Sequence, residues 1–269
     1  MSKLLYEKRD RIAWLTLNRP EAKNAIDPEL HQLLWQAWED FAADDDVDVA
    51  ILTGTGDAFC AGADLKTYIP PLFDPPRTPD WVRANVATGI GGLTRGLHRI
   101  YKPTIAAVNG WALAGGLETA LACDIRIASE RAMFGSFEAR RGYHHGDGGI
   151  VRLVDVCGAG VALEMLLTAE PIDAQRALQC NMVSRIVPHD ELLAEAEKTA
   201  RQILRNSQRA VRSAKETILD VIGRPLDEQL RIEAVNGYSC ADVEETRALL
   251  GRFYEKSDRG RAGRHETPL

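Results

Sequence analysis

The chain has 269 residues, of which 45% are hydrophobic and 27% are charged, and its formal net charge is −6. This composition is that of an ordinary globular protein and excludes a fibrous or disordered chain. The negative charge provides no global attraction to nucleic acid or to an acidic membrane surface, so we expect neither as a partner. The apolar runs, such as residues 161–167, are far shorter than the roughly 20 residues that a membrane-spanning helix requires.

The cysteines and the first residues of the chain indicate a compartment. The five cysteines are odd in number, scattered and without the paired spacing of a zinc site, which predicts reduced thiols. The acidic Glu7 stands where a signal peptide requires an apolar run. We therefore expect a cytoplasmic protein, and we expect no metal site.

The first half of the chain alternates between predicted strands and helices. Residues 6–17 are predicted to form a strand that Asn18-Arg19-Pro20 ends. Asp27 and Pro28 provide an N-cap and a first-turn proline for a helix whose apolar positions continue to Phe41. Three further apolar runs predict strands buried on both faces, namely residues 49–53, 104–108 and 124–128.

A loop and a series of helices are predicted for the other segments, and the chain is mostly helical from residue 150 onward. Prolines between residues 69 and 79 predict a surface loop, and a helix is expected over residues 81–100. Further helices with a 3.6-residue period are expected at residues 159–167, 174–181, 191–205, 210–222 and 226–235. Residues 182–187 are expected to be extended.

This order of elements predicts an α/β core followed by a helical part. We place the core at residues 1–195 and the helical region at residues 196–258. Residues 259–269 are polar and rich in Gly, Arg and Pro, so we expect them to be mobile or to take part in subunit contacts. The helical region has apolar faces to cover, which predicts self-association.

Two loops rich in small residues, at 59–66 and 109–118, follow predicted strands. Small side chains let backbone N–H groups approach a ligand, and a helix that begins with glycines presents its positive end to negative charge. Two converging N–H groups of this kind form an oxyanion hole. Neither loop has the Gly-x-Gly-x-x-Gly or Walker pattern of a nucleotide site.

Several signatures follow one another along the chain. They are Asn18-Arg19-Pro20 with Asn24-Ala25, Ala61-Gly62-Ala63-Asp64-Leu65-Lys66, Lys102-Pro103-Thr104 through Asn109-Gly110, Gly115-Gly116-Leu117-Glu118, Cys123-Asp124, Phe134-Gly135 and Glu138. On these motifs the sequence resembles the enoyl-CoA hydratase/isomerase family, also called the crotonase family, from the first strand to about residue 256. The resemblance implies an α/β fold with a crotonase-like (ββα)-repeat spiral core and a C-terminal helical trimerisation region. It also implies homotrimers or hexamers made of two trimers.

The resemblance further implies the catalytic residues. The N–H groups of Ala63 and Gly115 match the positions that polarise the thioester carbonyl of an acyl-CoA. Glu118 and Glu138 match the two glutamates that hydratases of the family use to add water across a 2,3-double bond. Hydration needs one group to take a proton from water and another to deliver a proton to the α-carbon, and two carboxyl groups can divide these roles. The implied activity is that of an enoyl-CoA hydratase, a hydro-lyase without a cofactor, because coenzyme A is part of the substrate.

The resemblance also implies contacts with the acyl-CoA thioester. The residues that match substrate-binding positions are Lys23, Ala25, Ala61, Asp64, Leu65, Lys66, Phe253 and Lys256. The last two are expected to reach the adenine region from a neighbouring subunit. Tyr68, Leu72 and Trp81 are candidates to line the acyl slot or to be ordinary packing residues.

The segment after Glu138 departs from the family pattern. It places Arg140, His144, His145 and Asp147 near the expected acyl pocket. One interpretation is a substrate with a polar distal group, and another is an additional acid–base pair for hydrolysis. The interpretation that we favour is that both histidines face solvent or a subunit interface.

Three competing interpretations stay open at the level of sequence. An isomerase that shifts a Δ3 double bond to Δ2 needs one base at the position of Glu138, so the additional Glu118 favours a hydratase. Without catalysis, Glu118 would only complement a helix N-terminus and Glu138 would pair with Arg140 or Arg141. A nucleic-acid-binding member is suggested by four arginines, Arg201, Arg205, Arg209 and Arg212, but Asn206-Ser207 is expected to interrupt their helix.

Overall fold

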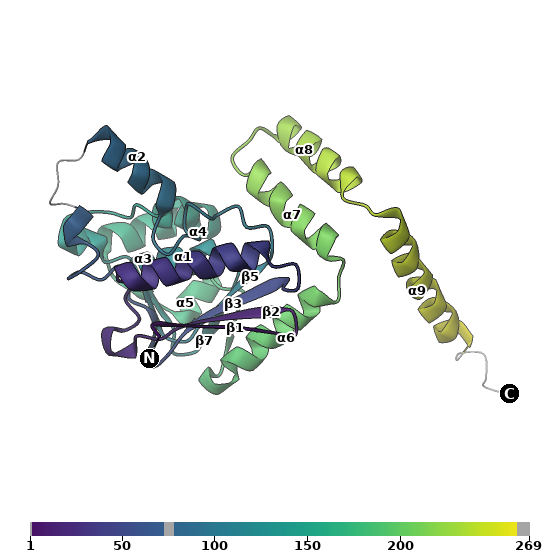
Figure 1. Ribbon diagram of the computed structural model, residues 1–269, viewed down its shortest axis with the longest axis horizontal. Coiled ribbons are helices and arrows are strands. Elements are labelled where there is room, and N and C mark those ends of the chain that lie inside the picture. The colour runs from purple at the N-terminus through teal and green to yellow at the C-terminus, as the bar shows by residue number, and fades with distance from the viewer. Residues whose placement is uncertain (1, 73–77, 263–269) are drawn as a thin grey trace. The chain divides into compact units, whose positions relative to one another are not determined.

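The computed structural model describes residues 2–72 and 78–262, and the chain divides into two compact units, Met1–Arg205 and Asn206–Leu269. The first unit holds both β-sheets and six α-helices among its described residues. Figure 1 shows these elements along the chain. Helix α6 (Leu192–Leu204) runs across the predicted core limit at residue 195 and packs on the larger sheet of the first unit.

The larger sheet has six strands in the order β1-β2-β3-β5-β7-β10. Its strands are β1 (Leu4–Arg9), β2 (Ile12–Leu17), β3 (Val49–Gly54), β5 (Thr104–Val108), β7 (Ile125–Ser129) and β10 (Arg185–Val187). All neighbours are parallel except β1 and β2. The single strand predicted over residues 6–17 is therefore wrong, because Asp10 and Arg11 adopt positive φ angles of 51° and 65° and turn the chain into a hairpin.

The smaller sheet has four short strands in the order β4-β6-β8-β9. They are β4 (Ala58–Cys60), β6 (Trp111–Leu113), β8 (Met133–Gly135) and β9 (Ile172–Asp173). Strands β3, β5 and β7 of the larger sheet are each followed by one strand of the smaller sheet and then by a helix. This recurring strand–strand–helix unit is the expected (ββα)-repeat core.

The helices of the first unit cover both sheets. They are α1 (Pro28–Ala43), α2 (Pro79–Thr88), α3 (Gly115–Ala122), α4 (Gly149–Thr168), α5 (Ala174–Gln179) and α6 (Leu192–Leu204). Helix α1 begins as predicted, with the Asp27 side chain accepting the N–H of Leu30 at 2.8 Å. Helix α2 is shorter than the predicted helix over residues 81–100, because positive φ angles at Gly89, Gly91 and Gly92 end helical geometry there.

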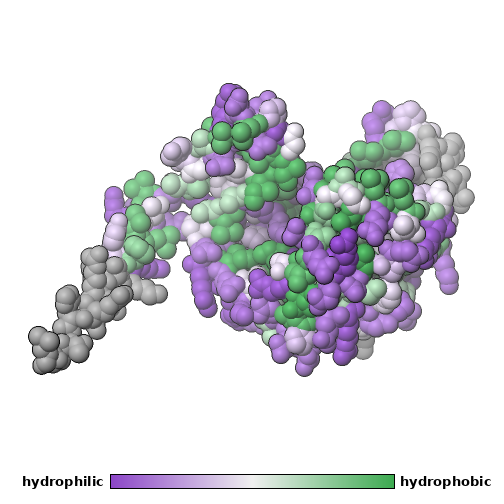
Figure 2. All heavy atoms as spheres, turned by 180° about the vertical axis from the view of Figure 1, so that it is seen from behind, coloured by the Kyte–Doolittle hydropathy of each residue, from purple (hydrophilic) through white to green (hydrophobic). Residues whose placement is uncertain are grey.

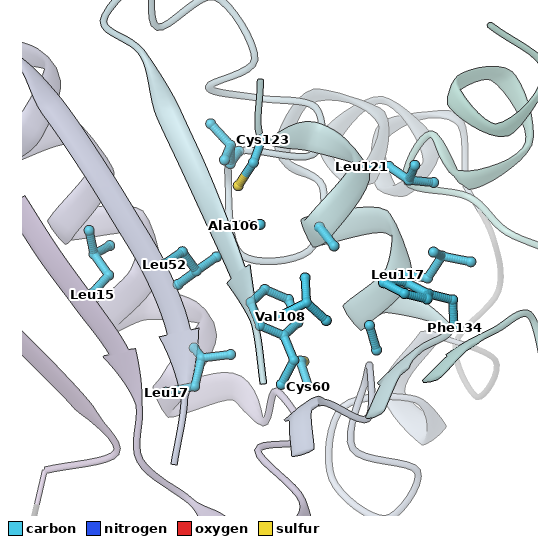
Figure 3. Close-up of a cluster of buried hydrophobic side chains, with 14 of the residues drawn as sticks. Leu15, Leu17, Leu52, Cys60, Ala106, Val108, Leu117, Leu121, Cys123 and Phe134 are labelled. Atoms are coloured by element: carbon cyan, nitrogen blue, oxygen red, sulfur yellow. The ribbon is translucent and has the colours of Figure 1, made fainter. Parts of the chain in front are cut away.

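Alternate residues of β2, β3, β5 and β7 in the larger sheet enter two separate cores, whereas the edge strand β1 contributes to one of them only. Leu15 and Leu52 belong to the main core, which includes α1, α3 and the smaller sheet, and Figure 3 shows these two leucines with Leu117 and Phe134. Trp14 and its neighbours on the opposite face pack under α6. Both faces are buried, as expected for strands with continuous apolar runs.

The second unit consists of three helices within residues 206–262. They are α7 (Gln208–Val221), α8 (Leu226–Ser239) and α9 (Val243–Ala262). The predicted interruption at Asn206-Ser207 is confirmed, because Ser207 caps α7 by accepting the N–H of Ala210. Helix α9 includes the first part of the predicted tail, whereas residues 263–269 of that tail lie outside the described residues.

Apolar side chains remain exposed on both units, and Figure 2 shows hydrophobic surface among hydrophilic residues. Those of the second unit are Ile218, Ile222, Leu226, Leu230, Val235, Tyr238, Val243, Leu249, Leu250, Phe253 and Tyr254. In the part of the chain that the structure describes, no helix combines the length and the apolar character needed to cross a membrane.

Candidate active site

A pocket of about 730 Å³ lies in the first unit. Its lining comes from segments far apart in the sequence: the turn at η1 (Pro20–Ala22), the loop after β4, the start of α3 and residues 137–147. Tyr68 and Trp81, the two candidates for the acyl slot with described side chains, both line it. The side chain of the third candidate, Leu72, lies outside the described residues.

The two residues predicted to form the oxyanion hole, Ala63 and Gly115, both line this pocket. They are close together, since a Cβ atom placed on Gly115 would lie 3.4 Å from the Ala63 nitrogen. The residues on either side of Ala63 are hydrogen-bonded to Ile26. Ile26 donates its N–H to Gly62 O, and Asp64 donates its N–H to Ile26 O. Gly115 is the first residue of α3, so its N–H has no acceptor within the helix. Two adjacent N–H groups are thus left for a ligand.

The start of α3 requires an unusual backbone. Ala114 adopts φ 52° and ψ −124° and donates its N–H to Gly135 O at 2.9 Å. A Cβ atom on Gly116 would lie only 2.0 Å from Cys60 O, so only glycine fits where α3 meets β4. This close contact holds the N–H of Gly115 beside the loop that carries Ala63.

The Asn18-Arg19-Pro20 motif supports the same loop. The Arg19 Nη1 atom donates to Ala25 O at 3.0 Å and to Asp64 Oδ2 at 2.6 Å. The buried Asn24 side chain accepts the N–H of Arg19 and donates to Thr55 O, both at 2.9 Å. These residues therefore fix the position of Ala63 without contributing reactive groups.

Glu118 is buried in the first turn of α3 and lines the pocket. Its Oε1 atom accepts the N–H groups of Asp147 at 2.8 Å and Gly149 at 2.9 Å. Its Oε2 atom has no hydrogen-bond donor among the described residues. One oxygen is thus held by the backbone, and the other is available to a ligand.

Glu138 is buried in the short 3-10 helix η3 (Glu138–Arg141) and also lines the pocket. Ser136 Oγ donates to Glu138 Oε2 at 3.2 Å. Among the described side chains, Arg140 pairs with Glu170 instead, and Arg141 donates to Phe137 O. Pairing of Glu138 with either arginine is therefore excluded.

His145 lies between the two glutamates, with 1% of its side chain exposed. Its Nδ1 atom is 2.9 Å from Glu138 Oε1 and 3.2 Å from Glu118 Oε1. Both contacts are within ion-pair distance, but neither has the geometry of a hydrogen bond from the ring N–H. Burial disfavours the charged ring, but the adjacent carboxylates of Glu118 and Glu138 outweigh it and raise the pKa of His145 to about 9.

The favoured expectation that both histidines face solvent or an interface is confirmed for the exposed His144 only, and for His145 it is wrong. The reason is tertiary, since α3 and η3 bring two carboxylates to the place where the loop carries residue 145. Asp147 does not form the suggested pair with a histidine. Its Oδ1 atom accepts the Ile90 N–H at 3.1 Å and lies 3.2 Å from Arg95 Nη2.

Five of the eight predicted substrate-binding residues line the pocket. They are Ala25, Ala61, Asp64, Leu65 and Lys66. Lys23 does not line it, and its Nζ atom pairs with Asp57 at 2.8 Å. Phe253 and Lys256 belong to α9 of the second unit, where Phe253 is exposed and the Lys256 side chain lies outside the described residues.

Glu118, Glu138 and His145 are also the one group of three His, Cys, Asp or Glu side chains, among those described, that lie within reach of a single cation. Their nearest oxygen and nitrogen atoms lie within 4.8 Å of one another.

The comparison with known proteins matches the enoyl-CoA hydratase/isomerase family model to residues 7–260. The chain belongs to this family. A probable mitochondrial enoyl-CoA hydratase of Dictyostelium discoideum is 37% identical over 254 residues, which cover 93% of this chain and 87% of that protein. A short-chain-enoyl-CoA hydratase of Clostridium acetobutylicum is 33% identical over 258 residues, covering 95% of this chain and 96% of that one.

Solved structures of this enoyl-CoA hydratase/isomerase family share the fold. The crystal structure of an enoyl-CoA hydratase subunit from Geobacillus kaustophilus has a TM-score of 0.84 at 32% identity, with 95% of this chain and 96% of that chain covered. The expected crotonase-like α/β core is therefore confirmed. Sequence reasoning missed that His145 contacts both glutamates, because the sequence of the loop alone does not show that it returns to α3.

Proposed function

We propose that this chain is an enoyl-CoA hydratase, a hydro-lyase that adds water reversibly to a 2-enoyl-CoA and gives a 3-hydroxyacyl-CoA. The observation that carries the proposal is the combination, in one pocket, of two unused backbone N–H groups and two buried carboxylates. One oxygen of Glu118 and one of Glu138 lie within 4.8 Å of each other, so both carboxylates can act on the same substrate. The similarity to proteins named as enoyl-CoA hydratases supports the same activity.

In this proposal the N–H groups of Ala63 and Gly115 donate to the thioester oxygen. That oxygen gains negative charge as water attacks the β-carbon and an enolate forms, and one such donor is worth about 3 kcal/mol of transition-state stabilisation. Backbone donors held at a helix start need no rearrangement during the reaction. They therefore favour the enolate over the ground-state thioester.

The two carboxylates divide the proton transfers. Glu118 has an unoccupied Oε2 atom, so we assign it the proton of the attacking water. Glu138 then supplies the proton that bonds to the α-carbon, and dehydration follows the same steps in reverse. No metal or redox cofactor takes part in this reaction, and coenzyme A enters only as part of the substrate.

Two other activities fit the pocket less well. A Δ3–Δ2 isomerase requires one base beside the carbon chain, which leaves the buried Glu118 without a function. A hydrolase that uses a histidine–aspartate pair requires contact between Asp147 and His144 or His145. Asp147 instead contacts Arg95 and the Ile90 N–H, which favours the hydratase.

The coenzyme A portion is assigned to the mouth of the pocket, with Lys66 and Leu65 from one loop and Ala25 from the turn at η1. Lys23 is assigned to the nucleotide end, and Phe253 and Lys256 are expected to reach the adenine region from a neighbouring subunit. Lys23 exchanges its exposed pair with Asp57 for a phosphate at little cost, because exposed ion pairs are worth only about 0–1 kcal/mol.

We also propose that the protein assembles into homotrimers or hexamers through its helices. The exposed apolar side chains of α8 and α9 support this, because a monomer gains nothing by leaving them in water. Light scattering coupled to size-exclusion chromatography tests it, and a monomer at micromolar concentration contradicts it.

A cytoplasmic location without a nucleic-acid partner completes the proposal. The five cysteines are free thiols, which suits a reducing compartment. Arg201 pairs with Glu197 and Asp10, and Arg209 pairs with Asp242, so these two cations are neutralised within the protein. Cell fractionation tests the location, and salt-dependent binding to an RNA oligonucleotide would contradict the second part.

The decisive experiment is the hydration of a panel of 2-enoyl-CoA esters from short to long and aromatic. Wild type, Glu118→Gln and Glu138→Gln are compared, with the exposed Glu170→Gln as control. We expect both pocket variants to lose about 10²–10⁴ in kcat while still binding CoA esters, and the control to match wild type. Binding without hydration by wild type, or hydration by both variants, would contradict the proposal.

A further inference from the structure

His145 is a buried titratable residue of the pocket to which the proposed hydration gives no role. Its ring is packed tightly, because a Cβ atom on Gly149 would lie 2.6 Å from its Cγ and Nδ1 atoms. The ring therefore occupies space that a larger residue at position 149 would fill. Among the described residues, neither ring nitrogen makes a hydrogen bond of regular geometry, so Nδ1 meets the two carboxylates through short contacts and Nε2 meets no polar partner.

We propose that His145 is a positioning residue that stores the proton used in hydration and returns it from Glu118 to Glu138 after each turnover. This inference rests on the proposed hydratase function. It follows from the contact of one ring atom, Nδ1, with Oε1 of both carboxylates at 3.2 and 2.9 Å. A proton on that atom reaches either glutamate without crossing solvent.

The proton balance closes over one cycle. Glu138 gives a proton to the α-carbon and takes one from His145 Nδ1, while the hydroxyl oxygen of water bonds to the β-carbon. The remaining proton of water passes to Glu118 Oε2. The neutral carboxyl group of Glu118 then rotates about its Cγ–Cδ bond, so that the protonated oxygen faces the neutral Nδ1 and gives its proton to it. His145 and both carboxylates thereby return to their starting charges.

The charged groups around His145 come from several elements and affect its pKa. Glu118 comes from α3 and Glu138 from η3, and both favour the protonated ring. Asp147, from the same loop as His145, adds a further acidic group whose charge is partly balanced by Arg95. Arg152 of α4 donates to Asp147 O at 3.1 Å and adds an opposing positive charge. Two carboxylates in direct contact outweigh the more distant cations.

The consequence is a pH dependence that a purely structural histidine would not produce. The His145 ring has a raised pKa of about 9, so its second proton is present below that pH and is lost above it. The hydratase therefore retains kcat/KM through neutral pH and loses it as pH rises through about 9. Without His145, the stored proton has to reside on a carboxyl group, which releases it at lower pH.

The test compares pH profiles of kcat/KM for wild type, His145→Gln and the control His98→Gln, an exposed histidine that does not line the pocket. Glutamine keeps a side-chain N–H but cannot release a proton. We expect His145→Gln to stay within about threefold of wild type near pH 6 and to fall at least about tenfold below it at pH 8.5, with His98→Gln parallel to wild type. Parallel profiles for wild type and His145→Gln would overturn the proposal, as would loss of wild-type activity in EDTA.

A second measurement needs neither activity nor a folded variant at position 145. The chain has six histidines, and ¹⁵N-histidine labelling reports the protonation of each ring. We expect one ring of the wild type to stay protonated at pH 8, and that signal to titrate at lower pH in Glu138→Gln. If every ring is neutral at pH 8, the storage of the proton is excluded, whereas a wild type that hydrates no enoyl-CoA contradicts the proposed function alone.

Discussion

The reacting groups at one end of the pocket belong to the backbone, and those at the other end are side chains. At one end, the N–H groups of Ala63 and Gly115 belong to the backbone and are held by a contact that only Gly116 allows. At the other end, Glu118, Glu138 and His145 are side chains held by one another and by the backbone of residues 147 and 149. The reacting groups of the first end are thus not side chains, whereas each substitution at the second end changes a reacting or proton-carrying group.

This difference indicates which end of the pocket can change the reaction that is catalysed. A backbone oxyanion hole stabilises negative charge in any acyl-CoA substrate. The side-chain end decides which protons move, and a change of one residue there alters the reaction or its pH dependence.

Among the variants that follow, the largest effect is expected from Gly116→Ala, which changes the backbone at the start of α3 and replaces no reacting side chain. The new Cβ atom would meet Cys60 O at 2.0 Å and displace the start of α3. We expect a loss of about 10²–10³ in kcat/KM, comparable to removal of one oxyanion donor. Gly160→Ala in α4 is the matched control, since nothing lies within 4 Å of its Cβ atom. Full activity in Gly116→Ala would show that the N–H of Gly115 is not needed.

A somewhat smaller loss is expected from Glu118→Asp, which keeps the charge of the side-chain end but shortens its reach by one methylene group. The shorter carboxylate cannot both accept the N–H groups of Asp147 and Gly149 and contact the attacking water. Misplacement by about 1 Å costs roughly 10²-fold in rate, so we expect kcat to fall by that factor with KM nearly unchanged. The exposed Glu170→Asp serves as control, and a normal kcat in Glu118→Asp would remove Glu118 from the proton transfers.

The support of the backbone end is tested by Asn24→Ala. This change removes the donor to Thr55 O and the acceptor of the Arg19 N–H, and residue 24 has a φ angle of 56°. We expect the free energy of unfolding in urea to fall by about 1–3 kcal/mol. Asn181→Ala, with a similar φ angle of 63° on an exposed residue, separates the backbone strain from the lost hydrogen bonds. Equal losses in both variants would refute the supporting role.

The smallest effect concerns acid stability. Although burial opposes it, hydrogen bonds with Lys3 and the Leu30 N–H lower the pKa of Asp27, and contact with Arg19 lowers that of Asp64. A lowered pKa stabilises the fold above the unfolded value near 4, and this stabilisation is lost as pH falls below it. In urea titrations, Asp27→Asn and Asp64→Asn should be less stable than wild type at pH 7 and should approach it at pH 3. A constant difference would contradict this assignment.

Much of the fold was predictable because its signals are local. The N-cap at Asp27 and the buried runs of β3, β5 and β7 are properties of short segments, and they appear where expected. The hairpin at Asp10 and Arg11 was not predicted, since neither residue is a glycine that announces a positive φ angle. The short strands of the smaller sheet were also missed, because three residues carry too little periodicity to distinguish a strand from a loop.

The sequence by itself determined the family, the α/β architecture and the candidate residues, because these follow from short motifs whose order along the chain is visible. Only the tertiary structure decided what surrounds His145. Burial and ionic contact depend on segments near residues 118, 138 and 145 that meet in space through the packing of α3 against the smaller sheet. The charge of a histidine depends on those neighbours, so the same residue in the same loop sequence would be an ordinary exposed side chain if the two glutamates lay elsewhere.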